Sequence, residues 1–451
     1  MTKGAITLTI VFEGMNLNRD EGVGRNVQTL KKLHRGDGLV YTFMSRQALR
    51  YAISKKLIEE FGWKETEVTR RGEGEKKTNQ FDMSKANIIE YEEMDFFGYM
   101  YTIGGENAFV RSAVCKLTPA ISLEKFSFDQ SFNTNHEMVK RAIKCGEESV
   151  PNLWQTEDHL SLYKYSFVID LDKVGKMDDK EKKIVLEKKD AAEFLKGYEK
   201  YMSNEDKEKC KSLTEGEYSL NKNGKIIEKI ILNKNGKIIG KIILKEKNEE
   251  KETESKEETK KREKQKATSY EIEIEINLPV EEKIRRIVDF LKAIKTLSRG
   301  IQGNINSLAP LFVIGGIISA KTPLAYPLVE LIPGTSRKLN KGMIDYCEKI
   351  LTESSIIVEK TNGSFKIINS QGHRSEKQGQ TQEKNCEEQG QTQIKNKYIV
   401  KGIVKGKFEN GHEFNDWKDP LEALDELIKF IESKDFENYL SECENYESSK
   451  N

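Results

Sequence analysis

The chain has 451 residues, of which 33% are charged and 36% are hydrophobic, and its 75 basic residues nearly balance its 74 acidic residues. A net charge of +1 excludes binding to nucleic acid through overall charge, so any such site must concentrate basic residues locally. The longest apolar run, near Leu308 to Ala320, is too short to cross a bilayer, and we expect no membrane partner.

The first predicted element is a strand from Ala5 to Glu13, a segment rich in Ile, Thr and Val. Gly14 to Gly38 follows as a long loop rich in Asn, Arg and Gly, and long loops in compact domains are usually functional or disordered. The N-terminus lacks the pattern of a signal peptide, because its apolar run is short and is typical of a strand.

A helix is predicted from Ser45 to Phe61, because the Ser45 hydroxyl can accept a hydrogen bond from a free backbone N–H and Gly62 can end the helix. The helix carries one apolar stripe at i, i+4 and i+8, formed by Leu49, Ile53 and Leu57.

The start of this helix is a candidate phosphate site. Arg46 and Arg50 are four residues apart and project from one face, with Gln47 beside them. A capped helix start that carries two Arg and a Gln can hold a phosphate backbone. The alternative interpretation is a solvated basic face on an ordinary amphipathic helix.

Strands are also predicted at Arg111 to Leu123, broken at Pro119, and at Leu160 to Leu171. Trp63 to Met83 is charged and predicts an exposed excursion, and Phe126 to Asp158 is expected to be irregular. Period two places several aromatic residues of the later strand on one face, which we expect to be core: Tyr163, Tyr165 and Phe167.

A near-exact duplication follows, in which Asn221 to Leu232 is repeated as Asn233 to Leu244. Each copy contains Asn-Gly, which predicts a hairpin turn between short Ile-rich strands. Two interpretations stay open: a repeated β-ribbon with a function, or a tandem duplication in a tolerant surface insertion. Lys245 to Lys266 consists almost wholly of Lys, Glu, Ser and Thr and predicts a disordered or solvated helical linker.

The last part of the chain predicts strands, helices and a low-complexity stretch. They are a strand at Tyr270 to Leu278, a helix at Glu281 to Leu297, a turn at Ser298 to Gly303, a buried strand at Leu311 to Ser319, low complexity at Lys377 to Lys395 and a helix at Pro420 to Ile431. The order of elements predicts an α+β fold with an antiparallel sheet and helices on one face, as in the split β-α-β-β-α-β unit.

The six cysteines are scattered, and no C-x-x-C pair is present, so we expect no zinc or other metal site. Free thiols of this kind are typical of a reducing cytoplasm, which is the expected location.

Six segments in order resemble one known family: the opening strand, the NRDEG loop, SRQALR, DFFGYM, RSAVCKLTPAISLEKF and TLSRGIQGN. They resemble the CRISPR-associated backbone subunit of type I-B Cascade, the Cas-seven or DevR autoregulator family of the RAMP superfamily. The resemblance covers most of residues 1–171 and 281–333, and it omits the duplicated hairpins and the low-complexity segments.

The resemblance implies an α+β fold with an RRM-like (ferredoxin-like) palm, an antiparallel sheet, a thumb-like hairpin and large insertions. The implied divisions are a first palm part at 1–171 with a thumb-like insertion at about 118–160, a variable insertion with duplicated hairpins and charged linker at 172–268, a second palm part at 269–335, and a C-terminal helical and low-complexity region at 336–451.

The function implied by the resemblance is non-enzymatic. Copies of the chain would oligomerise along the guide, while target DNA is read by pairing with that guide and not by the protein. The implied partners are CRISPR RNA, target DNA through the guide, other copies of the chain and other Cascade subunits, and no cofactor is implied.

The resemblance also implies the residues that contact RNA. Phosphate contacts are implied for the first loop, the helix start and a Gly-containing turn, and stacking wedges for the thumb. They are Asn18, Arg19, Asn26, Ser45, Arg46, Gln47, Arg50, Arg299, Gly300, Gln302 and Gly303, with Phe128 or Phe132 as the wedge. For each Phe the alternative is a local core contact.

Three competing functions stay open. Asp20 in the first loop could cut RNA, as in related type III subunits, although a salt-bridged surface acid is the simpler interpretation. His34 could serve a processing endonuclease, although a lone loop His is more often a phosphate contact or a surface residue. A transcriptional autoregulator rests on the family label, and no convincing helix-turn-helix supports it.

Overall fold

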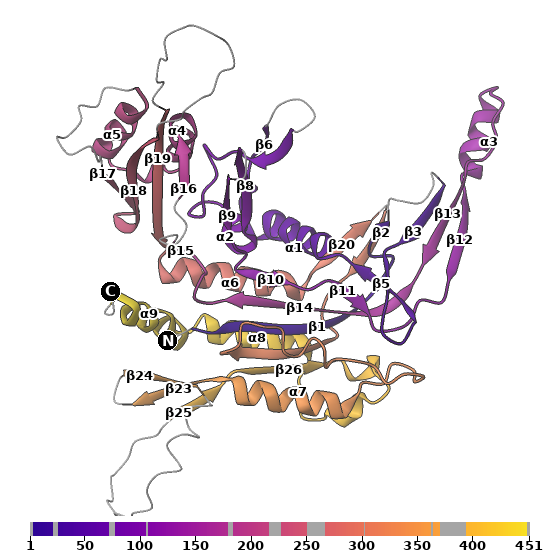
Figure 1. The fold of residues 1–451 in the computed structure, drawn as a ribbon. Coiled ribbons are helices and arrows are strands. Elements are labelled where there is room, and N and C mark those ends of the chain that lie inside the picture. The colour runs from indigo at the N-terminus through magenta and orange to yellow at the C-terminus, as the bar shows by residue number, and fades with distance from the viewer. Residues whose placement is uncertain are drawn as a thin grey trace, which may run out of the picture. The chain divides into compact units, whose positions relative to one another are not determined.

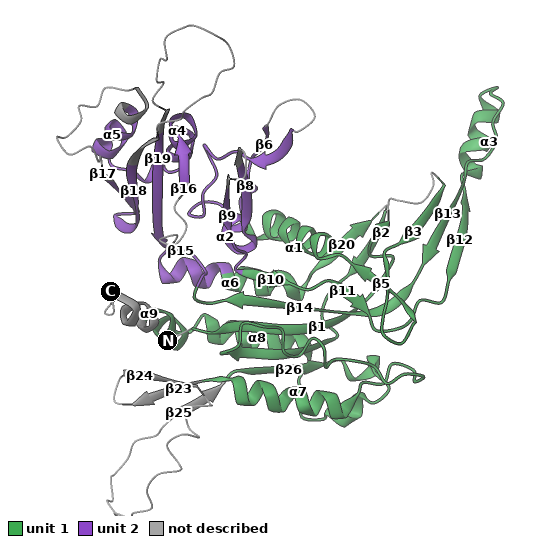
Figure 2. Ribbon diagram, in the orientation of Figure 1, with its two compact units in different colours: residues 1–62, 115–172, 287–451 green, residues 63–114, 173–286 purple. Residues whose placement is uncertain are grey.

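The computed structural model describes residues 3–20, 26–71, 77–104, 107–178, 184–215, 227–249, 267–301, 303–361, 364–369 and 394–448. The chain forms two compact units (Figure 2): unit 1 contains residues 1–62, 115–172 and 287–451, and unit 2 contains residues 63–114 and 173–286. The boundaries of these units differ from the divisions expected from the sequence, because residues 63–114 group with 173–286 and not with the first palm part. In the described part of the chain, no helix is long and apolar enough to cross a membrane.

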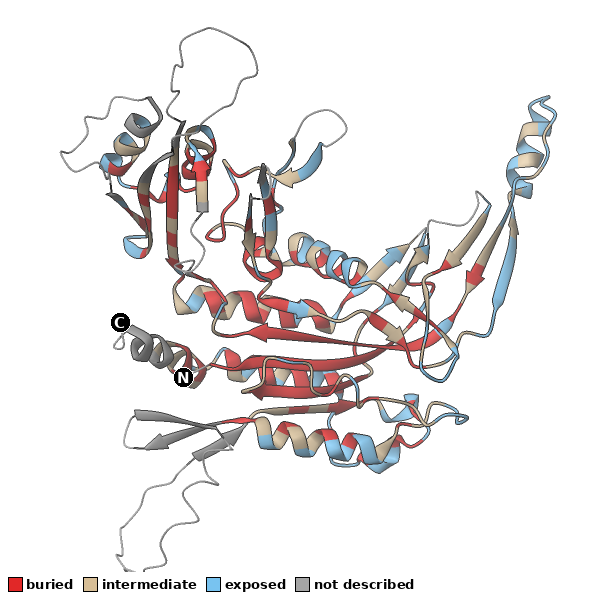
Figure 3. Ribbon diagram, in the orientation of Figure 1, coloured by how far each residue is buried: buried red, intermediate tan, exposed pale blue. Residues whose placement is uncertain are grey.

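The core of unit 1 is an antiparallel sheet with β1 (Ala5–Met15) and β14 (Leu160–Asp170) at its centre. These two strands pair along their length, and nearly all of their side chains are buried (Figure 3). The strands run in the order β26, β22, β1, β14, β11, β5 and β4, with β10 beside β14. Their bounds are β4 (Lys32–His34), β5 (Val40–Met44), β10 (Cys115–Leu117), β11 (Ala120–Ser122), β22 (Phe312–Ile318) and β26 (Ile399–Ile403).

This sheet confirms several predicted elements and the α+β class with antiparallel pairing. The predicted strands at 5–13, 160–171 and 311–319 form β1, β14 and β22, and the strand broken at Pro119 forms β10 and β11 on either side of it. The aromatic residues of β14 are core as expected, since Tyr163, Tyr165 and Phe167 are at most 1% exposed.

Helices cover both faces of the sheet, and the prediction of helices on one face is wrong. On one face the rings of Phe290 in α6 (Val280–Lys295) and Phe167 in β14 lie 5.0 Å apart, and α8 (Pro420–Ile431) lies beside α6. α7 (Lys341–Ser354) covers the opposite face, where successive strand residues point the other way. Its buried side chains join one cluster with those of β14 and β22: Leu162, Phe312, Ile344 and Leu351.

Unit 1 also contains a four-stranded sheet, which corrects the sequence analysis, and a separate hairpin (Figure 1). The segment expected to be irregular forms a hairpin of β12 (Asp129–Thr134) and β13 (Leu153–Asp158) with α3 (His136–Lys144) at its end. The expected first loop contains β2 (Arg19–Asp20), β3 (Val27–Leu30) and β4, and β3 pairs with β13. The predicted turn at Ser298 lies in a hairpin of β20 (Ser298–Ile301) and β21 (Asn304–Ser307).

Unit 2 contains a sheet in the order β15, β19, β18, β17, with β16 also on β19, and two short hairpins. Its elements are β6 (Val68–Arg71), β7 (Thr78–Phe81), α2 (Glu92–Phe97), β8 (Tyr99–Gly104), β9 (Asn107–Arg111), β15 (Lys176–Asp178), β16 (Ile184–Glu187), α4 (Lys188–Lys196), α5 (Asn204–Glu215), β17 (Ile227–Lys234), β18 (Lys237–Glu249) and β19 (Ala267–Asn277). The expected exposed excursion is only partly exposed, because Trp63 and Met83 at its ends are buried.

The duplicated segment forms a hairpin at its second Asn-Gly, where Asn235 and Gly236 adopt positive φ angles of 52° and 77° between β17 and β18. The first Asn-Gly, at 223–224, lies outside the described residues. The first part of the expected linker is strand and not linker, since β18 continues to Glu249, and residues 250–266 lie outside the described residues.

The C-terminal region is not only helical. It contains α7, α8 and α9 (Lys434–Ser448), but also β23 (Ile356–Thr361), β24 (Ser364–Asn369), β25 (Ile394–Lys397) and the edge strand β26 of the central sheet. The predicted helix at Pro420 to Ile431 is confirmed with the same bounds, although α9 follows it. Residues 370–393, which hold most of the low-complexity stretch, lie outside the described residues.

Candidate nucleic-acid interface

The helix start singled out by the sequence begins α1 (Arg46–Phe61). Ser45 is its N-cap, and the Ser45 hydroxyl accepts a hydrogen bond from the Ala48 backbone N–H at 3.2 Å. Gly62 ends the helix with a φ of 70°, a conformation that glycine adopts without a steric penalty. The predicted helix and both of its end signals are therefore confirmed.

The side chains of α1 divide between the core and solvent as the sequence pattern predicts. Leu49, Ile53 and Leu57 are fully buried and fix the orientation of the helix. The polar side chains of the first turns lie on the exposed side: Arg46, Gln47 and Arg50. The positive end of the helix dipole and these two guanidinium groups thus face solvent together.

The β20–β21 hairpin, far away in the sequence, reaches the same helix start. Arg299 donates a hydrogen bond from Nη1 to the main-chain oxygen of Ala48 at 2.7 Å. The Met15 N–H donates to the Asn306 side chain at 2.9 Å, so the hairpin is also fastened to the end of β1. Burial lowers the pKa of the Arg299 guanidinium.

The glycines of this hairpin lie in open surroundings. Gly300 and Gly303 are exposed, and Gly303 has a φ of 85°, which favours glycine at the turn. A Cβ added at Gly303 would meet no atom within 4 Å, so the space on that side of the residue is open. Gln302, the fourth predicted residue of this turn, lies outside the described residues.

The first loop joins the helix start through Asn18. The backbone N–H of Ser45 donates to the Asn18 side-chain oxygen at 2.9 Å, so the loop holds the residue that caps α1. Asn18, Ser45 and Arg299, which lie far apart in the sequence, therefore meet around one helix terminus.

The other predicted residues of the first loop do not share this arrangement. Arg19 is directed inward, where Nη1 donates to the main-chain oxygens of Glu157 at 2.7 Å and Gln28 at 3.3 Å, and burial lowers its pKa. Asn26 is exposed, and its main-chain oxygen accepts from Gln155. His34 is exposed at the end of β4.

Both candidate wedge residues are exposed on the β12–β13 ribbon. Phe132 in β12 is 80% exposed, and Phe128, just before β12, is 69% exposed. Phe128 touches Phe126 edge to face at 6.2 Å between ring centroids, whereas Phe132 has no ring partner among the described residues. Neither ring belongs to the core, so the alternative of a core contact does not describe them.

Two apolar residues at this surface were missed by the sequence analysis. Tyr51 is 63% exposed directly after Arg50, and Ile305 is 83% exposed opposite Gly300 in the β20–β21 hairpin. Each leaves a sequence signal, because Tyr51 lies outside the apolar stripe of α1 and Ile305 stands alone among polar residues. Both side chains can pack on bases or sugars of a bound strand.

The candidate catalytic residue of the first loop, Asp20, lies beside a lysine. Asp20 is half exposed, and its carboxylate lies 3.6 Å from the Lys31 ammonium. Among the described residues, no group of three or more His, Cys, Asp or Glu side chains has the geometry to hold a metal ion.

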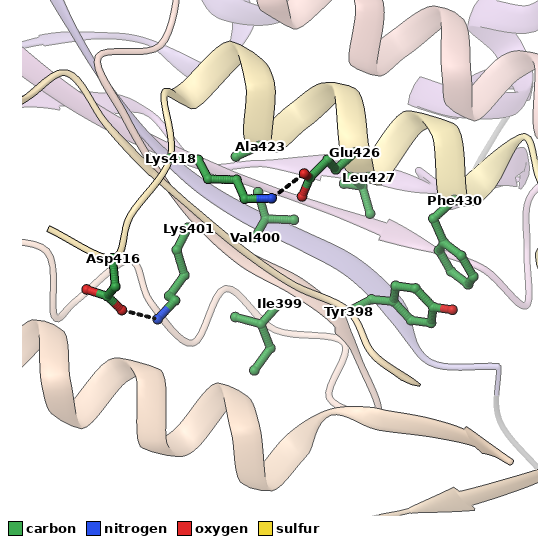
Figure 4. A pocket seen from close by; sticks show the side chains of 10 residues that line it. All are labelled: Tyr398, Ile399, Val400, Lys401, Asp416, Lys418, Ala423, Glu426, Leu427 and Phe430. Carbon is green, nitrogen blue, oxygen red and sulfur yellow. Dashed lines mark hydrogen bonds and ion pairs between the residues drawn. The ribbon is translucent and has the colours of Figure 1, made fainter. Parts of the chain in front are cut away.

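A cavity of about 340 Å³ lies elsewhere in unit 1, between β26 and α8 (Figure 4). Its charged side chains form two ion pairs, Lys401 with Asp416 and Lys418 with Glu426. Because these charges are already paired, the cavity is a poorer place for a phosphate than the start of α1.

Comparison with known proteins places the chain in a sequence family. The model of a family described as "CRISPR-associated negative auto-regulator DevR/Csa2" matches residues 6–341. A solved chain from a "CRISPR RNA-guided surveillance complex, pre-nicking" is similar, with 10% identity and a TM-score of 0.37 over 77% of this chain and 88% of that chain. No curated protein matches the sequence significantly.

Proposed function

The chain belongs to the CRISPR-associated DevR/Csa2 family, and we propose that it is an RNA-binding backbone subunit whose copies pack along one CRISPR RNA. The observation that carries the proposal is the meeting of Asn18, Ser45 and Arg299 at the start of α1, beside exposed Arg46 and Gln47. A helix start with two arginines offers backbone N–H groups, a positive dipole end and guanidinium donors to one phosphate backbone.

In this proposal the residues divide by role. Arg46, Gln47 and Arg50 contact phosphates, and the backbone of Gly300 and Gly303 lies against the same strand. Asn18, Arg19 and Arg299 position these groups, because each side chain already forms a hydrogen bond with a main-chain atom of the protein.

The central sheet of unit 1 serves as the RRM-like palm and the β12–β13 ribbon as the thumb, with exposed Phe132 and Phe128 stacked against bases. Arg19 fastens β13 to the first loop, which couples the ribbon to the phosphate-binding end of α1. Target DNA pairs with the exposed stretches of guide, so sequence is read by pairing. Other copies of the chain and other subunits of a type I-B Cascade in the cytoplasm complete the assembly.

The proposal assigns no catalytic residue to the chain. Asp20 forms an ion pair with Lys31 in the first loop, which is an ordinary arrangement for a surface acid. His34 is exposed at the end of β4, and an endonuclease also needs a positioned nucleophile and a group that stabilises the leaving oxygen.

The proposal is tested by titrating labelled CRISPR RNA with the full chain. The double variant Arg46→Glu/Arg50→Glu should weaken binding about tenfold or more for every spacer sequence alike, because phosphate contacts carry no sequence information. The matched control is Lys349→Glu/Lys429→Glu, which changes the charge equally at exposed positions of α7 and α8. Equal binding by both double variants would refute the helix-start site.

Salt dependence gives an independent measure. If each copy neutralises about four to six phosphates, the logarithm of the binding constant should fall with the logarithm of salt at about −0.7 per phosphate. A flat response would rule out a groove that follows the RNA backbone.

A second candidate, a transcriptional autoregulator, is favoured by the description of the matching family as a negative auto-regulator. It predicts preference for a specific DNA duplex over single-stranded RNA. Competition between a promoter duplex and unrelated single-stranded RNA of equal length distinguishes the two functions.

A further inference from the structure

The sequence duplication has a structural counterpart in unit 2. The second half of the first copy forms β17, and the corresponding half of the second copy forms β18. The two strands pair antiparallel with Ile230 opposite Ile242, which is the same position in the other copy, twelve residues later. Two strands of almost the same sequence therefore lie side by side.

The edge of β18 that faces away from β17 pairs with β19, a strand in which Ile and Glu alternate. Ile274 lies opposite Ile242 on the buried face, and both are at most 2% exposed. On the other face Lys241 lies opposite Glu275, with 2.6 Å between ammonium and carboxylate, and Lys245 contacts Glu273 at 2.6 Å. The repeated sequence thus binds an extended strand of alternating aliphatic and acidic residues.

On the equivalent side of β17, no strand in the described part of the chain pairs with it beyond β18. A short 3-10 helix, Glu199–Tyr201, also lies near β17. Lys229, the equivalent of Lys241, is exposed, and it forms no ion pair with a carboxylate in the described part of the chain. It lies opposite Ile243, and its diagonal neighbours Lys241 and Lys245 are already paired with Glu275 and Glu273, so an added carboxylate would pair with the Lys229 ammonium.

We propose that the outer edge of β17 binds an extended peptide segment of alternating aliphatic and acidic residues, supplied by another protein, which extends the sheet as β19 does. Backbone hydrogen bonds provide the affinity, and a glutamate opposite Lys229 provides the selectivity. Because β17 is a near-copy of β18, the strand edge that pairs with β19 is present a second time in β17.

The segment is expected to pair with β17 from Lys229 to Leu232, around Ile230. This part of β17 corresponds to Lys241 to Leu244 of β18, which pair with β19. In β18 it begins directly after Gly240, where an added Cβ would collide with the main-chain oxygen of Glu275.

The probe is a labelled peptide with the sequence of Ser269 to Asn277, SYEIEIEIN, titrated by anisotropy into the full chain. Lys229→Glu should weaken binding about tenfold, since it places like charges opposite each other. A peptide with lysine at the position of Glu275 should restore binding to Lys229→Glu and bind the unaltered chain poorly. Lys237→Glu, an equal charge change beside the turn of the same hairpin, should have no effect.

Other outcomes overturn the proposal. No binding would mean that Lys229 only blocks the edge against aggregation. A peptide affinity that Lys229→Glu leaves unchanged would mean that the peptide replaces β19. Dimerisation of the chain that Lys229→Glu changes would make a second copy the occupant. Circular dichroism of Lys229→Gln and Lys229→Glu is the check that both variants fold.

Discussion

Arg299 donates a hydrogen bond to the main-chain oxygen of Ala48 across 251 residues of sequence. This contact joins the β20–β21 hairpin to the first turn of α1, where Ser45 supplies the cap. The guanidinium is partly buried, and burial lowers its pKa, but arginine stays charged in proteins. This hydrogen bond therefore keeps the positive charge of Arg299 next to the first turn of α1, where the proposed phosphate site lies.

Replacing Arg299 by methionine should lower the free energy of unfolding by about 1.5–3 kcal/mol, because a hydrogen bond to a charged group is lost from a partly buried position. RNA binding should weaken as well, since the hairpin loses its link to α1. Urea unfolding and RNA titration measure the two effects. Arg299→Lys is the control for charge alone, and full RNA affinity in Arg299→Met would contradict a positioning role.

Ser45 allows the capping role to be separated from the RNA-binding role. Ser45→Ala should cost about 1 kcal/mol of stability, because the Ala48 N–H loses its acceptor. Ser45→Asp keeps a good cap and suits the helix dipole, so it should preserve the melting temperature. The aspartate should nevertheless repel phosphate and weaken RNA binding. Normal RNA binding by Ser45→Asp would place the RNA elsewhere.

Phe132 should contribute to RNA binding and not to folding. At 80% exposure it buries little surface, so Phe132→Ala should leave the melting temperature unchanged. Loss of a stacked base should weaken binding by about 1–3 kcal/mol. Leu421→Ala, which removes another exposed apolar side chain from α8, is the control. Equal RNA affinity in the two variants would argue against a wedge.

Arg286 and Asp95 form a fully buried ion pair in unit 2, with 2.8 Å between Nη1 and Oδ2. Arg286 also donates to the main-chain oxygens of Ile88 and Ile89. Arg286→Met should destabilise the protein by about 1.5–3 kcal/mol, because hydrogen bonds to a charged group are lost, while Asp95 keeps its ion pair with Arg111. Adding Asp95→Asn should destabilise the protein further in chemical unfolding, because Arg111 then loses its buried carboxylate partner. A double variant more stable than Arg286→Met would contradict this explanation.

His159 should make stability depend on pH. It is buried directly before β14, its Nδ1 lies 2.7 Å from the Thr42 hydroxyl, and burial lowers its pKa below the usual 6.5. The unfolded chain therefore binds a proton more readily than the folded chain, so stability is complete above pH 6.5 and is lost as pH falls toward the folded pKa. Melting temperatures at about pH 7.5 and 5.5 should differ more in the unaltered chain than in His159→Gln. Equal differences would mean that another group titrates.

Local sequence signals predicted the elements that depend on neighbouring residues. The cap at Ser45, the glycine at Gly62 and the Asn235–Gly236 turn lie where short-range rules place them, because each depends on backbone geometry within a few residues. The helix at Pro420 to Ile431 has the predicted bounds, since a proline and an apolar stripe mark it.

The sequence analysis did not predict elements that depend on pairing or packing with residues far away in the sequence. β2 has only two residues, and it is a strand because Arg19 and Asp20 pair with β3. α3 is short and buries no side chain, so no core stripe marks it. Residues 63–114 belong to unit 2 through contacts such as Asp95 with Arg286, which lies 191 residues later.

The sequence alone thus determined the α+β class, the capped basic helix and the family motifs, because these follow from local periodicity and short segments. Only the tertiary structure decided which predicted residues meet. It brought Asn18 and Arg299 to the start of α1 and turned Arg19 inward to two main-chain oxygens. The reason is physical: partly buried polar side chains bind main-chain atoms, and the packing of the sheet decides which main-chain atoms lie within reach.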